Sequence, residues 1–128
     1  MNGSPPRPER FSKAHRLRHD REFQHVYEIR HRRESGPLLV YAASNTLTHP
    51  RLGLSVSRKV GGAVTRNRVK RRLRESFRKL KVRLDRPFDY VIVVRPHKPI
   101  TQEAYQTHLE TAMQKLADSW TPRKSGRP

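Results

Sequence analysis

Cysteine is absent from the 128-residue chain, which excludes disulfide bonds and zinc sites built on thiolates. Apolar residues make up only 33%, below the roughly 45–50% of an average domain, so any core is small. No apolar run approaches the length of about 18 residues that a membrane helix needs, and residues 1–11 lack the apolar centre of a secretory signal. We therefore expect one cytoplasmic domain.

Acidic residues are also scarce. Asp and Glu number 11 against 29 Lys and Arg, which gives a net charge of +18. Self-repulsion at this charge opposes compaction unless a polyanion neutralises it. Nucleic acid is the commonest such partner, and its binding should weaken steeply as salt rises. An anionic membrane surface is less favoured, because no segment has the apolar face with Trp and Phe that interfacial helices show.

Composition divides the chain into three parts. Residues 1–15 are rich in Pro, Ser and charge and predict a disordered basic arm, and residues 121–128 predict a disordered tail. The folded domain is expected over 16–120. Apolar periodicity predicts helices over 20–30 and 66–84 and after Thr101, and strands over 38–43, 52–57 and 88–94. This α-β-β-α-β-α order indicates an α/β fold with a small sheet and helices packed against it.

The strand 52–57 (LGLSVS) alternates strictly between large apolar and small residues. One face is therefore core, and the face with Ser55 and Ser57 lets a ligand approach closely. Thr65 is expected to cap the helix that follows it. This helix carries basic residues around most of its circumference and a single acid, Glu75. Such a helix gives up the i,i+4 ion pairs of ordinary surface helices, which favours contact with several phosphates. Free backbone N–H groups at 66–68 are expected to add to this anion site. A generic solvated basic helix is the competing interpretation.

The segments 53–61 (GLSVSRKVG), 65–71 (TRNRVKR) and 74–77 (RESF) together resemble the strand, turn and Arg-Asn-Arg helix of the bacterial ribonuclease P protein family. The resemblance extends from about Arg16 to Trp120 and is strongest over 53–77. It implies a two-layer α/β sandwich like domain 2 of ribosomal protein S5, with a mixed sheet and a left-handed βαβ crossover, an exception to the usual right-handed rule.

The resemblance also implies two RNA-binding surfaces. The catalytic RNA would meet the basic helix at Arg66, Asn67, Arg68, Lys70, Arg71, Arg74 and Arg78. The 5′ leader of precursor tRNA would lie in a cleft formed by Phe23, Tyr27, Tyr41, Ser55, Ser57, Arg58 and Lys59. Independently of the family, aromatic rings stack on unpaired bases without demanding a sequence. Ordinary core packing explains Phe23 and Tyr27 about equally well, since aromatic stripes are usually core.

No catalytic constellation is visible in the side chains. His15 and His19 have helical zinc spacing but no third ligand, and clustered carboxylates for magnesium are not evident. The resemblance implies that the RNA carries the active site and its Mg²⁺, with no cofactor held by the protein, no protein partner, and precursor tRNA as substrate. The chain would act in tRNA processing as the protein subunit of an endonuclease.

Three other functions remain open from the residues. A ribosomal protein or RNA chaperone explains the charge but not the aromatic surface; equal losses of precursor and mature tRNA binding in Phe23→Ala would favour it. A protein-only nuclease would cleave without RNA. A DNA-binding protein would lose RNA to competing duplex DNA, but the basic helix lacks a helix-turn-helix partner.

Overall fold

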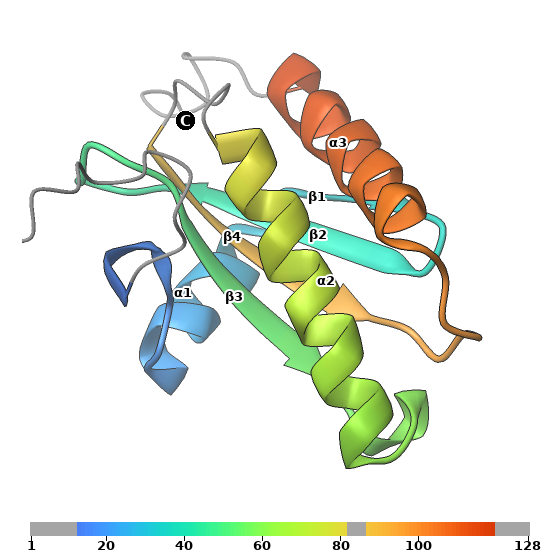
Figure 1. The fold of residues 1–128 in the computed structure, drawn as a ribbon. Coiled ribbons are helices and arrows are strands. Elements are labelled where there is room, and N and C mark those ends of the chain that lie inside the picture. Colours follow the sequence, from blue (N-terminus) through green and yellow to red (C-terminus); the bar gives the residue numbers. More distant parts are fainter. Residues whose placement is uncertain (1–12, 82–86, 120–128) are drawn as a thin grey trace, which may run out of the picture.

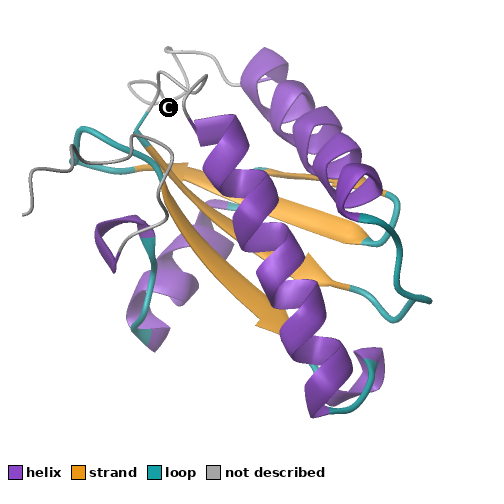
Figure 2. Ribbon diagram, in the orientation of Figure 1, coloured by secondary structure: helices purple, strands orange, loops and turns teal. Residues whose placement is uncertain are grey.

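The computed structural model describes residues 13–81 and 87–119. Most of the predicted arm (1–12), the predicted end of the basic helix (82–84) and the predicted tail lie outside the described residues. In chain order the elements are η1 (Lys13–His15), α1 (Asp20–Ile29), β1 (Arg32–Ser35), β2 (Leu38–Ser44), β3 (Arg51–Val56), η2 (Arg58–Val60), α2 (Ala63–Lys81), β4 (Phe88–Val94) and α3 (Gln102–Ser119) (Figures 1 and 2).

The four strands form one mixed sheet in the order β1-β2-β4-β3. β2 is antiparallel to both β1 and β4, whereas β3 and β4 are parallel and are joined through α2. In Figure 1 α2 lies in front of the sheet, and β4 lies to the left of β3 when one looks along the direction of β3. The β3-α2-β4 connection is therefore left-handed, against the rule that holds for about 98% of such units.

Helices cover both faces of this sheet (Figure 1). α2 and α3 bury the main core on one face, where Phe77, Leu73, Tyr105 and Leu109 are fully buried against β2, β3 and β4. α1 packs on the opposite face through Val26. The predicted α/β sandwich and the order of its elements are confirmed. The sheet has one further strand, β1, which pairs with β2.

The start of α2 differs from the prediction in two respects, its first residue and the backbone N–H groups that it leaves free. The helix begins at Ala63, and the backbone N–H of Arg66 donates to the Gly62 carbonyl at 2.9 Å. Thr65 therefore lies inside the first turn and is not the N-cap. The N–H groups without an intrahelical acceptor belong to 63–65, so the prediction that 66–68 supply them is wrong. Gly61 has a φ of 157°, and a Cβ there would lie 2.8 Å from the Thr65 side chain, so this turn requires glycine.

Candidate RNA interface

The exposed side of α2 is a strongly basic surface. The helix has nine Lys and Arg and one acid over Ala63–Lys81, while Val69, Leu73 and Phe77 anchor its apolar side in the core. Asn67, Arg68 and Arg71 are exposed. Arg66, Lys70, Arg74 and Arg78 are half-buried. The fold thus fixes the helix and leaves its polar groups available to a large ligand.

Several basic side chains of α2 also form hydrogen bonds or ion pairs with other groups of the protein. The Nε of Arg66 donates to the Gly61 carbonyl at 3.2 Å, and Arg78 pairs with Glu75, whose pKa lies below its usual range chiefly because of that hydrogen bond. Arg72 donates to the Ile100 carbonyl and so joins α2 to the loop before α3. The basic residues of α2 are therefore of two kinds. Some bind other groups of the protein, and the others, the outward groups, are exposed to solvent.

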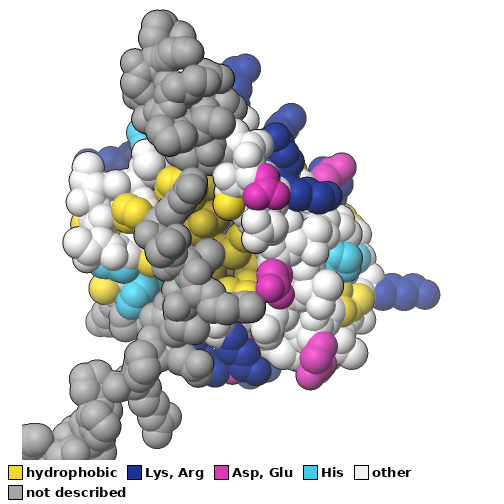
Figure 3. All heavy atoms as spheres, turned by 90° about the horizontal axis from the view of Figure 1, so that it is seen from above, with side chains coloured by type: hydrophobic (Ala, Val, Ile, Leu, Met, Phe, Trp, Pro, Cys, Tyr) yellow, Lys and Arg dark blue, Asp and Glu magenta, His cyan; other side chains and the backbone are white. Residues whose placement is uncertain are grey.

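α3 has the opposite character. Over Gln102–Ser119 it carries three acids and one lysine, so its charge is −2 beside the strongly positive α2. Figure 3, which views the molecule from above, shows these acidic side chains interspersed with basic ones on the side on which Figure 1 places α3. A polyanion approaching the helical face would therefore be drawn toward α2 and away from α3.

On the opposite face of the sheet, α1 and two strands form an aromatic patch of Phe23, Tyr27, Tyr41 and Ser55. All four residues are half-buried. The rings of Tyr27 and Tyr41 meet edge to face, with centroids 4.9 Å apart. Burial raises the pKa of the Tyr27 hydroxyl, and a hydrogen bond with Ser55 partly opposes that rise. These residues, predicted to lie together, do so.

The packing of Phe23 shows why β3 needs small residues where it faces α1. A Cβ added to Gly53 would lie 2.6 Å from the Phe23 ring, so the ring rests directly on the backbone of β3. The predicted alternation of β3 is confirmed here, since Leu52 is buried in the main core on the other face. Each aromatic side chain therefore packs partly against the core, and its exposed part is available to a ligand.

The other three predicted leader residues lie beyond the end of β3. Ser57, Arg58 and Lys59 are exposed, and the Ser57 hydroxyl accepts from the Lys59 backbone N–H at 3.3 Å. Ser57 therefore caps the η2 turn, and this turn leads from the edge of the aromatic patch toward α2. Sequence reasoning missed Arg32, whose guanidinium donates to the Tyr41 hydroxyl at 3.1 Å; its place on an unrecognised strand hid it.

A network of ionic hydrogen bonds holds the start of α1 to the sheet. Asp89, at 4% exposure, accepts two bonds from Arg51 at 2.9 and 2.8 Å and one from Asn45 at 2.7 Å. Arg51 also pairs with Glu22 at 3.2 Å, and Glu22 accepts from the backbone N–H groups of Arg18 and His19. The network fixes the helix that carries the aromatic rings.

Neither a metal site nor a membrane span is found in the described ranges. No group of three or more His, Asp or Glu residues that could hold a metal ion occurs in 13–81 or 87–119. His15 packs against His49, with ring centroids 4.8 Å apart, and the His49 ring bonds with the Ala14 carbonyl. No described helix has the length and apolar character needed to cross a bilayer.

Comparisons of the sequence and of the fold with known proteins give consistent matches. The family model described as Ribonuclease P matches residues 11–117. The ribonuclease P protein component of Macrococcus caseolyticus is 37% identical over 113 residues, covering 87% of this chain and 96% of that protein. A structure of a Staphylococcus aureus RNase P protein mutant with defective mRNA degradation activity superposes with a TM-score of 0.76 at 34% identity, covering 82% and 90% of the two chains. The RNase P protein of Thermotoga maritima gives 0.65 at 27% identity, covering 83% and 98%.

Proposed function

The chain belongs to the ribonuclease P protein family, and on that basis we propose that it is the RNA-binding subunit of a ribonuclease P that removes the 5′ leader from precursor tRNA. The activity is that of an endoribonuclease in tRNA processing. Its partners are the catalytic RNA of the ribonucleoprotein and precursor tRNA. The protein contributes binding and charge and no catalytic side chain.

The catalytic RNA is assigned to α2. The outward groups Asn67, Arg68 and Arg71 are exposed, and the half-buried Arg74 reaches into a hollow beside the helix. Guanidinium groups form paired bonds to phosphate, and an amide both donates and accepts toward ribose and bases. Arg66, Lys70 and Arg78 add charge to the same surface. Each phosphate contact releases counterions, so affinity should fall steeply with salt.

The 5′ leader is assigned to the aromatic patch. Exposed parts of Phe23, Tyr27 and Tyr41 offer ring faces and edges to unpaired bases, which suits leaders of any sequence. The Ser55 hydroxyl offers a hydrogen bond to the single-stranded leader. Ser57, Arg58 and Lys59 continue the path beyond the end of β3, where Arg58 and Lys59 supply positive charge.

Cleavage chemistry is assigned to the RNA. Hydrolysis at a phosphodiester is aided by metal ions that stabilise the attacking and leaving oxygens. We place the required Mg²⁺ on the RNA, and the protein's share is to hold the substrate and to neutralise crowded phosphates. No cofactor is assigned to the protein alone.

One observation carries this proposal: the edge strand β3 links the two surfaces. Its Gly53 lies against Phe23, its Ser55 belongs to the aromatic patch, and the turn that follows it leads directly into α2. A general RNA chaperone has no need of a basic helix and a stacking surface set at one edge of a sheet. A subunit that must hold an RNA and a single-stranded leader together does.

The test is reconstitution with purified components. The full chain is mixed with a bacterial ribonuclease P RNA and 5′-labelled precursor tRNA at low Mg²⁺, beside the protein alone and the RNA alone. Leader release in the mixture only is the expected result. Release by rigorously RNA-free protein, or tight RNA binding without stimulation of cleavage, would overturn the assignment.

A further inference from the structure

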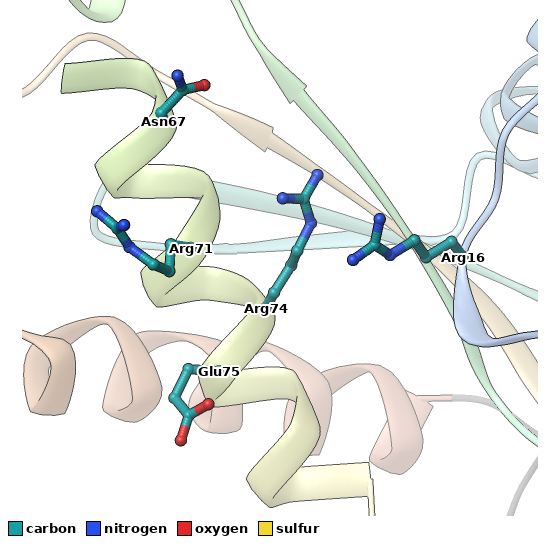
Figure 4. Close-up of a pocket in the computed structure, with 5 residues that line it drawn as sticks. All are labelled: Arg16, Asn67, Arg71, Arg74 and Glu75. Carbon is teal, nitrogen blue, oxygen red and sulfur yellow. The ribbon is translucent and has the colours of Figure 1, made fainter. Parts of the chain in front are cut away.

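Two arginines from distant parts of the chain face each other beside α2. A hollow of about 380 Å³ lies between that helix and the segment before α1, and it is lined by Arg16, Asn67, Arg71, Arg74 and Glu75. In Figure 4 the guanidinium groups of Arg16 and Arg74 point toward one another, while Arg71 and Glu75 point in other directions. The fold thus brings together two like charges that a folded protein ordinarily keeps apart.

The position of Arg16 is fixed by its backbone. Arg16 forms an isolated parallel bridge with Leu52 of β3, and the N–H of Leu17 donates to the Leu52 carbonyl at 2.9 Å. The Leu17 side chain is buried with Val26 under α1. Arg16 therefore extends from the edge of the sheet, and its approach to Arg74 is a property of the fold.

The electrostatics favour an anion between them. The pKa of Arg74 is lowered, first by burial and second by the positive charge of Arg16, and both causes act against its charge. Glu75 lines the same hollow, but it pairs with Arg78 and lies 4.0 Å from Lys79. An oxyanion between two guanidinium groups would replace their repulsion by charge-assisted hydrogen bonds.

We propose that this hollow binds one phosphodiester group of the RNA that contacts α2, held jointly by Arg16 and Arg74. The inference rests on the proposed function and adds to it a contact from outside α2. It extends the RNA interface across the hollow to the segment before α1. One strand of RNA would then contact both α2 and this segment.

Phosphate ethylation interference tests whether the contact is shared. Ribonuclease P RNA ethylated at about one phosphate per molecule is bound by the wild-type chain, by Arg16→Gln and by Arg74→Gln, and the phosphates whose ethylation weakens binding are mapped. A variant that lacks a contact no longer responds to ethylation at the contacted phosphate. Both variants should lose interference at the same phosphate, and each should bind unmodified RNA roughly tenfold more weakly, since one good charged contact contributes about 1.4 kcal/mol.

Arg18→Gln is the matched control, because Arg18 belongs to the same segment and shares a second hollow with Arg16 but does not line the hollow beside α2. It should keep the interference at the shared phosphate. Arg74→Gln should also leave the free protein at least as stable to heat at low salt, since it removes a like charge from beside Arg16. Heat unfolding of both variants separates lost contact from misfolding.

The outcomes are distinct. Loss of interference at two different phosphates, or none in Arg16→Gln, overturns the shared site while leaving the proposed function in place. Failure of the wild-type chain to bind ribonuclease P RNA overturns both. A free phosphate ion offers the same chemistry, so heat stabilisation by inorganic phosphate that needs both arginines, without a common phosphate in the RNA, would overturn the RNA assignment.

Discussion

Gly53 and Gly62 differ in what surrounds them. A Cβ on Gly53 would overlap the Phe23 ring at 2.6 Å, whereas a Cβ on Gly62 meets nothing within 4 Å. Gly53→Ala should push the Phe23 ring off β3 and weaken binding of precursor tRNA to the reconstituted particle by about 5–150-fold, the loss of roughly one stacked base. Binding of mature tRNA should change little.

Gly62→Ala is the control, and it should bind both tRNAs as the wild type does. The measurement is equilibrium binding of precursor and mature tRNA by each reconstituted particle. An equal loss for the two tRNAs in Gly53→Ala would show that the ring serves the fold alone.

Glu22 gives the protein an acid-sensitive contact. Its pKa is lowered below 4.5, first by the backbone N–H groups of Arg18 and His19, and burial opposes this less strongly. A lowered folded-state pKa means that the stabilisation is complete above pH 4.5 and is lost as the pH falls through the folded value. Glu22→Gln should therefore lower the free energy of unfolding by about 1–3 kcal/mol at pH 7.

Denaturant unfolding of wild type and Glu22→Gln from pH 7 to pH 3 checks this expectation. The two curves of stability against pH should converge as the pH falls below 4.5. Curves that stay parallel would mean that the carboxylate charge contributes nothing and that the side chain acts through its shape.

Within α2, neighbouring arginines have different roles. Arg71 is exposed, whereas Arg72 donates to the Ile100 carbonyl. Arg71→Gln should weaken binding of the catalytic RNA and reduce the slope of log affinity against log salt by about 1, with no loss of stability. Arg72→Gln should lower the unfolding free energy by about 1–2 kcal/mol and leave that slope unchanged.

The measurements are RNA affinity over a range of salt concentrations and denaturant unfolding of both variants. A reduced salt slope in Arg72→Gln, or an unchanged slope in Arg71→Gln, would contradict the division between inward and outward arginines. The two substitutions remove the same charge from adjacent positions, so each serves as the control for the other.

Sequence reasoning located the elements in which the pattern of apolar and polar side chains shows which residues are buried. The run at β4 is apolar except for Asp89, and β3 alternates, so both were found; Thr101 caps α3 as expected, with its hydroxyl 3.1 Å from the Ala104 N–H. β1 was missed because Arg32–Ser35 is an edge strand whose charged residues show no apolar face. The start of α2 was misplaced because Thr65 is a good capping residue, but the Gly62 carbonyl, one helical turn before Arg66, accepts the first bond.

The candidate site could be predicted only in part for a similar reason. Residues within one element, such as Phe23 and Tyr27, share a face by periodicity alone. The approach of Arg16 to Arg74 and of Arg51 to Asp89 depends on how the sheet is assembled, which no local pattern encodes. The family resemblance supplied the aromatic patch, and only the assembled fold revealed the arginine hollow.

Over the whole molecule, charge is segregated between two helices on the same side of the sheet. If RNA is confined to α2, charge added to the outer side of α3 should have little effect. Thr111 is exposed near the middle of α3. Thr111→Arg should change affinity for the catalytic RNA by less than about threefold and leave the salt slope as it is, since a charge beyond about 10 Å is largely screened at 0.1 M salt.

RNA binding by Thr111→Arg, measured beside Arg71→Gln, checks this confinement. A steeper salt slope in Thr111→Arg would mean that the RNA reaches across α3 and that the acidic surface takes part in the interface.

The bridge between Arg16 and Leu52 has a further consequence. β3 lies at the edge of the sheet, and an open edge presents unpaired N–H and C=O groups to which strands of other molecules can add, the first step of aggregation. The segment before α1 occupies part of this edge and bonds to Leu52. The residues that position Arg16 beside the hollow therefore also cover part of this edge, which should disfavour edge-to-edge joining of two copies of the protein.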